Sequence, residues 1–266
     1  MLTDISFIGG GKMAEAIIST IIQSEIIDKS NIFVSEPLSD RRSYLETTYG
    51  ITTVPENRNL THTGLLIISV KPQNLIEVCR DLYNNMNSNC TIVSIVAGAS
   101  LKILSDATNH KSVVRVMPNT PAQIGEGMSV WASSDNVPKK SLNDIEEILN
   151  SLGQQIFVLD EKYIDMATAL SASGPAYVFM FIESLIDAGV HIGMSRDMAR
   201  TLTLQMVLGS TKFVAHTGLH PASLKDMVTS PGGTTIEALV SMENDGFRAT
   251  IINAVIAAYD RSKELG

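Results

Sequence analysis

The sequence predicts an α/β protein in which a doubly wound, mostly parallel sheet is followed by an all-α domain. In the first part of the chain, short apolar runs rich in β-branched residues alternate with helix-like segments. From Tyr163 onward the strand signals vanish, and only long helical patterns follow. Strands of a parallel sheet read as continuous apolar runs because helices cover both faces. We therefore predict two domains, residues 1–162 and residues 163–266.

The expected strands share compact apolar runs and the expected helices share mixed patterns at helical spacing. The strands are at residues 5–8, 32–35, 65–70, 91–96 and 113–117, with 129–132 and 156–159 extending the sheet. The helices of the first domain are at residues 13–24, 40–49, 101–108 and 141–152. Those of the second domain are at residues 177–193, 196–217, 222–229, 235–244 and 247–263.

One helix of the second domain needs cover from outside. Residues 177–182, with the sequence YVFMFI, are apolar on every side of a helix. Such a helix must be covered all round, and a small helical domain has limited means of doing so alone. We therefore expect a second subunit to cover it. The uncharged run 166–182 is interrupted by the sequence SASGP at 171–175, so a membrane span is not expected.

Composition and charge narrow the class of protein. The chain has 266 residues, of which 44% are hydrophobic and 18% charged, which is typical of a folded globular protein. Its net charge of −8 argues against nucleic acid or an anionic membrane as the main partner. Cys79 and Cys90 are too few for a disulfide framework and lack metal-ligand spacing, so we expect buried thiols and no metal. With no basic leader before the first apolar run, we expect a cytoplasmic protein.

A glycine motif follows the first expected strand. Residues 7–14 read FIGGGKMA, a G-x-G-x-x-A pattern between an apolar strand and an amphipathic helix. Gly9 would permit the tight turn, Gly11 the approach of a pyrophosphate to the backbone, and Ala14 close packing of helix on strand. The pyrophosphate would then lie on free N–H groups at the helix N-terminus. This context predicts a Rossmann-type domain that binds NAD or NADP, the alternative being a glycine turn without a cofactor.

The residues after the second strand leave the choice of cofactor open. Glu36 could accept hydrogen bonds from a free ribose 2′-hydroxyl, which favours NAD. Arg41 and Arg42, one helical turn later, could instead pair with a 2′-phosphate, which favours NADP, or be merely solvated. The ends of the next two strands, at 69–72 and 95–97, should line the crevice for nicotinamide and substrate. Lys71 there is either a cation near cofactor phosphate or substrate carboxylate, or a surface lysine.

A second glycine loop lies in the helical domain. The sequence Ser230-Pro231-Gly232-Gly233 cannot continue a helix, and Thr234-Thr235 begins the next one. Such a loop presents free N–H groups and hydroxyls at one point, which suits a carboxylate. The alternative is an ordinary turn between helices with a threonine N-cap.

With these residues in place, the chain resembles the pyrroline-5-carboxylate reductase family over nearly its whole length. The resemblance is carried by residues 7–11, 70–72, 117–121, 173–177 and above all 224–239, LKDMVTSPGGTTIEAL. It implies reduction of 1-pyrroline-5-carboxylate to proline by hydride transfer from NADH or NADPH. It also implies a homodimer built by the carboxy-terminal helices, in some members assembled into a ring of dimers.

The resemblance also implies roles for individual residues. Ser230, Gly232, Gly233 and Thr234 would hold the substrate carboxylate, and the Thr235 hydroxyl would face the ring nitrogen as the catalytic, orienting group. The implied cofactor positions are Ile8, Gly9, Gly10, Gly11, Lys12, Met13, Glu36, Asn57, Ser69, Val70, Lys71, Pro72, Ile95, Val96 and Ala97. Gly218 and Met227 stand where some relatives carry polar residues near the substrate, which leaves the outer wall of the pocket open.

Two other functions fit part of the pattern. A different NAD(P)-dependent imine or keto-acid reductase could use the same two-domain plan. Such enzymes commonly place a catalytic lysine in the helical domain, where this chain offers serine, glycine and threonine. A non-catalytic dinucleotide-binding protein would bind the cofactor without turnover, and it has no evident need for the second glycine loop.

Overall fold

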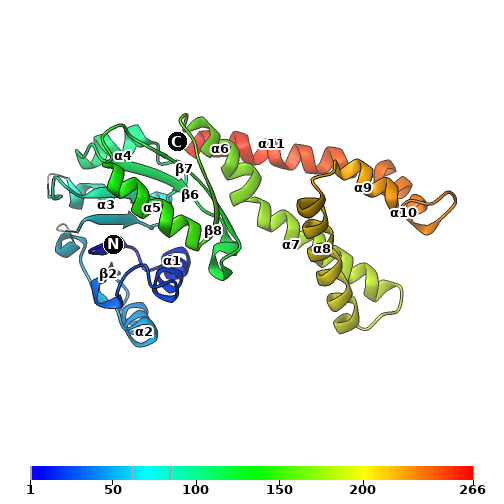
Figure 1. Cartoon of the computed structure of the whole chain (residues 1–266), viewed down its shortest axis with the longest axis horizontal. Helices are drawn as coiled ribbons and strands as arrows, with labels where there is room; N and C mark the ends of the chain where they lie inside the picture. Colours follow the sequence, from blue (N-terminus) through cyan, green and yellow to red (C-terminus); the bar gives the residue numbers. More distant parts are fainter. Residues whose placement is uncertain (1, 61–62, 84, 266) are drawn as a thin grey trace. The chain divides into compact units, whose positions relative to one another are not determined.

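The computed structural model describes residues 2–60, 63–83 and 85–265, and the chain divides into two compact units (Figure 1). The first comprises Met1–Ser173 together with Ala258–Gly266, and the second comprises Gly174–Ala257. The functional boundary expected between residues 162 and 163 stays a prediction, because contacts and function need not divide a chain at the same residue.

The first unit is built on one sheet. In the described part of the chain, eight strands pair in the order β3-β2-β1-β4-β5-β6-β7-β8. Every neighbouring pair is parallel except β6 with β7, which confirms the mostly parallel sheet. Their bounds are β1 Ile5–Ile8, β2 Ile32–Ser35, β3 Thr52–Val54, β4 Leu65–Ile68, β5 Thr91–Ser94, β6 Val113–Met117, β7 Gly127–Ser133 and β8 Gly153–Phe157. The order reverses between β1 and β4, where doubly wound sheets form their ligand crevice.

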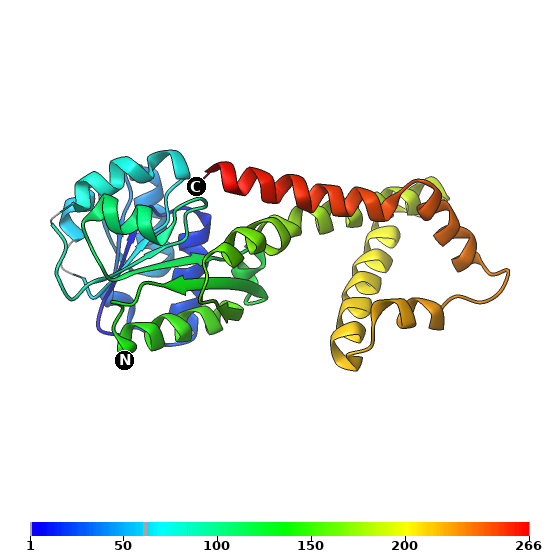
Figure 2. The same cartoon turned by 90° about the horizontal axis from the view of Figure 1, so that it is seen from above.

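Helices cover the sheet on both faces (Figure 2). The helices α1 (Lys12–Gln23), α2 (Ser39–Tyr49) and α5 (Lys139–Ser151) supply side chains to one apolar cluster, together with β1 and β2. The helices α3 (Leu75–Leu82) and α4 (Leu101–Thr108) supply a second cluster with β4 and β5. A third, smaller cluster forms under α6 (Lys162–Ala167). This sandwich confirms the doubly wound architecture.

Some elements differ from the predicted ranges. The strands β4 and β5 each end two residues early, so residues 69–70 and 95–96 leave the sheet as loop. The strand β8 begins and ends earlier than expected. The helix α3 is absent from the predicted segments, although its apolar residues recur at helical spacing. Short turns connect these elements: the 3₁₀ helices η1 Lys29–Asn31, η2 Asn57–Leu60, η3 Pro72–Asn74 and η4 Thr120–Ile124, and the π-helical turn η5 Thr168–Ala172.

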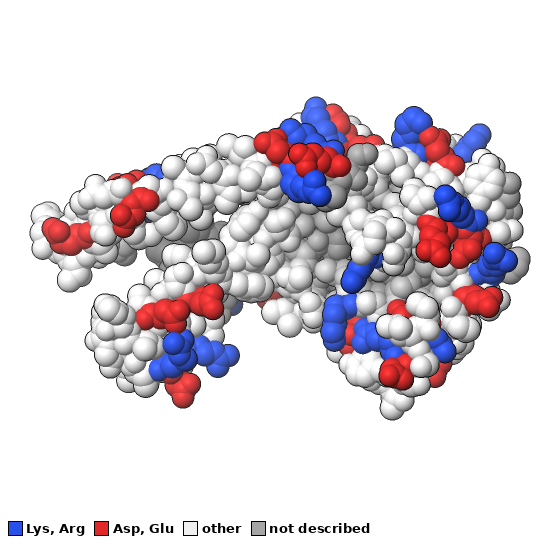
Figure 3. Space-filling model, turned by 180° about the vertical axis from the view of Figure 1, so that it is seen from behind, with Lys and Arg blue, Asp and Glu red and all other residues white. Residues whose placement is uncertain are grey.

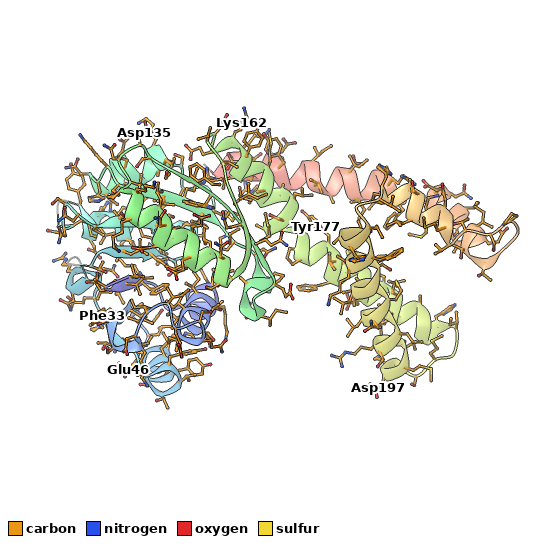
Figure 4. All side chains as sticks on the ribbon, in the orientation of Figure 1. Phe33, Glu46, Asp135, Lys162, Tyr177 and Asp197 are labelled. Atoms are coloured by element: carbon orange, nitrogen blue, oxygen red, sulfur yellow. The ribbon has the colours of Figure 1, made fainter. Side chains whose placement is uncertain are left out.

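The second unit is helical, as predicted. Its elements are α7 (Gly174–His191), α8 (Arg196–Thr217), α9 (Pro221–Met227), α10 (Thr234–Asn244) and α11 (Phe247–Leu265), whose last residues belong to the first unit. Tyr177, near the beginning of α7, and Asp197, in the first turn of α8, mark two of these helices in Figure 4. The two helices pack closely, because a Cβ atom added at Gly189 would lie 2.8 Å from the Cβ of Ala199.

The second unit buries little of its apolar surface. Among its described residues, only Ala199, Thr203 and Leu224 are buried. Phe179 and Met180 in α7 are 60% and 70% exposed. Much of the surface seen in Figure 3 carries neither acidic nor basic side chains. Three methionines of this unit are also exposed: Met198, Met206 and Met242.

The helix α7 continues a longer helical stretch. The sequence at 171–175, expected to interrupt the apolar run, instead lies within the stretch Lys162–His191, which includes the π-helical turn. Pro175 is tolerated because it lies in the first turn of α7, where its missing N–H group costs little. By length and composition this stretch could cross a membrane, which for a single helix is weak evidence.

Candidate active site

A cavity lies at the carboxyl ends of β1, β2 and β4. Its volume is about 840 Å³, which suits a small-molecule cofactor. The predicted cofactor residues that line it are Ile8, Gly9, Gly11, Glu36, Asn57, Ser69, Val70 and Lys71. The structure therefore brings together residues from the glycine motif, from the end of β2 and from the end of β4.

The turn at Gly9 requires glycine. Its φ angle is +95°, a conformation that other residues rarely adopt, and a Cβ atom there would lie 2.9 Å from the carbonyl oxygen of Ser69. The Gly9 N–H donates to the carbonyl of Ser35 at 2.8 Å. The side chain of Ser69 donates to the Gly9 carbonyl at 2.8 Å. The turn after β1 is thus fixed between β2 and β4.

The beginning of α1 fits a phosphate group. Gly11 is its N-cap residue, and no side chain caps the helix. A Cβ atom built on Gly11 would meet no atom within 4 Å, so the backbone there faces open space along the cavity. Free N–H groups at a helix N-terminus attract anions. Ala14 is fully buried, which fits its expected role in close packing of α1.

Glu36 joins the glycine loop to the end of β2. Its Oε2 atom accepts a hydrogen bond from the Gly10 N–H at 2.9 Å, and its Oε1 atom accepts one from the Leu38 N–H at 3.0 Å. The side chain is buried and lines the cavity. Gly10 is itself tightly enclosed, since a Cβ atom there would lie 2.7 Å from the Cδ1 atom of Leu45.

The two arginines of α2 hold the loop backbone. Arg41 donates from Nε to the Gly10 carbonyl at 2.6 Å and from Nη2 to Glu15 at 2.6 Å. Arg42 donates from Nη1 to the carbonyls of Glu36 and Pro37, each at 2.9 Å. Neither arginine lines the cavity. The sequence suggested a 2′-phosphate ligand or a solvated side chain, and neither role includes this support of the loop backbone.

Glu15 is the centre of the cluster that holds Arg41. Burial alone would raise the pKa of its carboxyl group, but hydrogen bonds from Arg41, Tyr44, Tyr49 and Lys12 outweigh burial and lower the pKa to about 2. The tyrosine hydroxyls donate to Oε1 at 2.8 and 3.1 Å. Burial, followed by the bond to Glu15, raises the pKa of Tyr49 to about 12. Sequence spacing gave no signal for this cluster, because its members lie on two separate helices.

Asn57 lies at the edge of the cavity and is held from two sides. Its Oδ1 atom accepts a hydrogen bond from the Ser35 hydroxyl at 2.7 Å, and its Nδ2 atom donates to Asp81 at 3.0 Å. Asp81 belongs to α3, which supplies further lining residues that the sequence did not indicate: Glu77 and Val78. The helical spacing of apolar residues in α3 is the signal that could have found them.

The remaining predicted cofactor positions do not line this cavity. They are Gly10, Lys12, Met13, Pro72, Ile95, Val96 and Ala97. Lys12 has an exposed side chain that pairs with Glu15 at 3.3 Å. Val96 is buried in the second apolar cluster, and Ile95 packs against the first. Pro72 begins η3 next to Lys71, whose ammonium group forms no hydrogen bond or salt bridge within the described ranges.

The second glycine loop leads into α10, in the other unit. The N-cap residue of α10 is Gly233 and no side chain caps the helix, so the threonine N-cap considered as an alternative is wrong. Gly232 has a φ angle of +66°, and the Gly233 N–H donates to the Ser230 carbonyl at 3.1 Å. A Cβ atom on Gly233 would collide with the Ser230 hydroxyl. The N–H groups in the first turn of α10, with the hydroxyls of Thr234 and Thr235, can donate hydrogen bonds to an anion.

Other residues singled out in the sequence lie as follows. Gly218 ends α8 in a left-handed conformation, and Met227, the last residue of α9, is 66% exposed. Both cysteines are buried free thiols, as predicted. Burial raises the pKa of Cys79 to about 11 and that of Cys90 to about 12. Within the described ranges, no group of three or more potential metal ligands was found.

The sheet, the glycine turn and the uncapped helix over a cavity define a dinucleotide-binding oxidoreductase fold. Comparisons with known proteins agree with this class. Residues 4–98 match the family model described as NADP oxidoreductase coenzyme F420-dependent. Residues 161–265 match the model described as pyrroline-5-carboxylate reductase dimerisation.

Relatives that match this chain over its full length identify the family more narrowly. The pyrroline-5-carboxylate reductase of Synechocystis sp. is 41% identical over 267 residues, covering 100% of this chain and 99% of the relative. That of Glycine max is 40% identical over 262 residues, covering 98% and 95%. A crystal structure of Plasmodium falciparum pyrroline carboxylate reductase with NADP bound has a TM-score of 0.92 at 35% identity, covering 99% of this chain and 98% of that one. The chain belongs to the pyrroline-5-carboxylate reductase family.

Proposed function

We propose that this protein reduces 1-pyrroline-5-carboxylate to proline with NADH or NADPH. The observation that carries the proposal is the sequence identity of 40–41% over nearly the whole chain to reductases of this name. The cavity that includes the glycine turn supports it. The bound cofactor supplies a hydride to the imine carbon. The chain's own residues bind and align the two reactants, which can lower the barrier by several kcal/mol.

For the cofactor, we propose that the glycine loop and the beginning of α1 hold the pyrophosphate. The uncapped N-terminus of α1 and the open space beside Gly11 support this role. Glu36 and Asn57 line the part of the cavity next to β2 and β3, where the adenosine ribose would bind. Lys12, Met13, Pro72 and residues 95–97 remain proposed cofactor positions, although they do not line the cavity.

For the substrate, we propose that Ser230, Gly232, Gly233 and Thr234 bind the carboxylate and that Thr235 orients the ring nitrogen. The absence of a side-chain cap on α10 supports an anion site, because the first N–H groups of a helix need an acceptor. A threonine hydroxyl is a poor general acid. We therefore assign Thr235 a hydrogen bond to the nitrogen as it becomes an amine, with any net proton coming from water or from an already protonated imine.

For the assembly, we infer a homodimer formed through the second unit, with a ring of dimers as a further possibility for the complete enzyme. The exposed apolar side chains of α7 and α8 need a cover, and the family model over residues 161–265 is that of a dimerisation domain. We infer that a second copy of the chain, and not a membrane or nucleic acid, covers these side chains. We also infer that the protein is cytoplasmic. Light scattering distinguishes a monomer, a dimer and a larger ring by mass.

A direct assay tests the activity. The purified protein is mixed with 1-pyrroline-5-carboxylate and either reduced cofactor, and proline formation is followed together with cofactor oxidation. We expect both to proceed at equal rates. Parallel assays use keto acids in place of the imine. Turnover with keto acids alone would assign the chain to another reductase activity, and cofactor binding without turnover on any substrate would indicate a non-catalytic protein.

A further inference from the structure

The chain carries a feature that can distinguish NADH from NADPH, and it lies where the second strand ends. In doubly wound folds the residue at this position meets the adenosine ribose, which carries a 2′-hydroxyl in NADH and a 2′-phosphate in NADPH. Here that residue is Glu36, the first after β2. Its backbone N–H donates to the Val54 carbonyl at 3.0 Å, which fixes it to β3, and its side chain lines the cavity.

The Glu36 carboxylate is held in place by its two bonds to the Gly10 and Leu38 N–H groups. A carboxylate has about four acceptor sites, so both oxygens keep capacity for a further donor. A ribose hydroxyl is such a donor. A phosphate monoester has a charge of about −1.5 to −2 at neutral pH, and it would meet a fixed negative group at this point.

The cations around this position are committed to other partners. Arg41 is bound to Gly10 and Glu15, and its guanidinium lies 5.0 Å from the centre of the Tyr44 ring. Arg42 is bound to two backbone carbonyls. Arg58, which does line the cavity, has a largely exposed side chain and lies 3.7 Å from Asp81. To gain a bidentate partner, a 2′-phosphate would have to draw Arg41 or Arg42 from their hydrogen bonds, or Arg58 from Asp81.

By its position in the sheet, Lys71 lies too far from the end of β2 to pair with a 2′-phosphate there. It follows β4, and β4 is separated from β2 by β1 in the sheet. It is therefore placed toward the glycine turn, while Glu36 and Glu56 line the cavity near β2 and β3. At this end of the cavity the carboxylate of Glu36 is held by hydrogen bonds, while the side chain of Arg58 is largely exposed.

We propose that Glu36 makes this protein select NADH over NADPH, an inference that rests on the proposed use of the cavity for the cofactor. The carboxylate accepts hydrogen bonds from the ribose hydroxyls of NADH and repels the 2′-phosphate of NADPH. Its bond to Gly10 ties this selection to the loop that holds the pyrophosphate.

Titration of the purified full-length protein with each reduced cofactor, without substrate, tests the proposal through binding. We expect NADH to bind at least tenfold more tightly than NADPH at low salt. Because the side chain of Glu36 is buried, salt should screen its repulsion of the 2′-phosphate only weakly, so the ratio should largely persist as ionic strength rises. Equal binding, or tighter binding of NADPH, would overturn the proposal.

Glu36→Gln separates discrimination from loop support. It keeps one carbonyl oxygen for the loop but removes the charge. Loss of loop support alone lowers both affinities by the same factor, whereas loss of discrimination lowers the NADH-to-NADPH affinity ratio. We expect the ratio to fall at least fivefold, and an unchanged ratio would show that Glu36 does not select the cofactor. If this variant does not fold, the ratio of the two affinities in the native protein decides.

Asp40→Asn is the matched control. It removes the same charge from the first turn of α2 but does not line the cavity, so the ratio should stay nearly unchanged. An effect equal to that of Glu36→Gln would assign the preference to overall charge and not to Glu36. The binding test and the activity test can give different results. A protein that prefers NADH but does not reduce 1-pyrroline-5-carboxylate would contradict the proposed function alone. A protein that binds neither cofactor would contradict both the proposed function and the proposed role of Glu36.

Discussion

The sheet-bearing unit and the helical unit differ in where their apolar side chains find cover. In the first unit, helices on both faces bury Phe7, Ile18, Leu66 and Ile92 almost completely. In the second, the side chains of Phe179, Leu202 and Phe213 are each more than half exposed. Burial of apolar area is the dominant favourable contribution to folding. The first unit therefore contains its own core, while the second needs a core completed by another copy.

Among the predicted variants, Gly11→Val should have the largest effect, and this effect concerns cofactor binding by the first unit alone. Its side chain would enter the open space beside the beginning of α1, so the fold should persist while pyrophosphate can no longer approach. We expect cofactor affinity to fall more than about 100-fold, a loss of roughly 3 kcal/mol. Calorimetric titration measures the affinity, and circular dichroism checks the fold. Retained affinity would refute the assignment of the glycine loop.

Gly9→Val provides a contrast within the same loop. Its Cβ atom would lie 2.9 Å from the Ser69 carbonyl, in a backbone conformation that valine avoids. We therefore expect this variant to lower the midpoint of thermal unfolding as well as cofactor affinity. Similar thermal stability of the two variants would contradict the distinction between an open and an enclosed glycine.

Phe179→Asp tests the cover of the second unit. A charge in an apolar interface is costly unless it is paired, so we expect the oligomer to dissociate or lose stability by about 3 kcal/mol or more. Light scattering gives the mass, and the concentration dependence of thermal unfolding gives the coupling to assembly. Ile76→Asp is the control, because Ile76 in α3 is 50% exposed but belongs to the self-contained unit. Equal loss of mass in both variants would remove the proposed difference between the units.

Thr235→Ala is a smaller change in the helical unit. Loss of one hydrogen bond to a reacting, charged nitrogen costs about 1.5–3 kcal/mol, so we expect kcat to fall roughly 10- to 100-fold. The dissociation constant of the cofactor alone should stay the same. Thr235→Ser should recover most of the rate because it keeps the hydroxyl. An unchanged kcat in Thr235→Ala would exclude Thr235 from the site.

Glu15→Gln should have the smallest effect, and one that depends on pH. The folded-state pKa of Glu15, about 2, lies below its ordinary value of 4.5. The ionised carboxyl therefore stabilises the fold above about pH 4.5, and this contribution is lost as pH falls toward 2. We expect the variant to lose about 1 kcal/mol at pH 7 and to approach the native protein below pH 4.5. Denaturant unfolding at several pH values measures this, and a difference that does not vary with pH would contradict the cluster.

The sequence predicted the features that depend on local pattern. The ranges of β1, β2, β6 and α8 were predicted to the residue, because buried strands and capped helices leave signals within a few positions. The same holds for the turn at Gly9. The assignment of individual substrate and cofactor roles rests on family resemblance and stays a prediction.

The features that the sequence missed depend on contacts between distant residues. Arg41 and Glu15 meet across 26 positions, and no spacing pattern in the sequence links them. The exposure of Met198, Met206 and Met242 is not visible in the sequence either, because an apolar pattern does not show which surface covers the side chains. Helix α3 was detectable from its amphipathic spacing, and with it the residues of α3 that line the cavity.

The last residues of α11 return to the first unit, where the Ser262 hydroxyl donates to the Asp165 carbonyl, 97 positions earlier in the chain. A ribosome must therefore synthesise the entire helical segment before the nucleotide-binding half is complete. During that interval the apolar side chains of the helical unit are already exposed, while the last turns of α11 have not yet emerged. The first unit is thus completed only after the residues of the second have been synthesised.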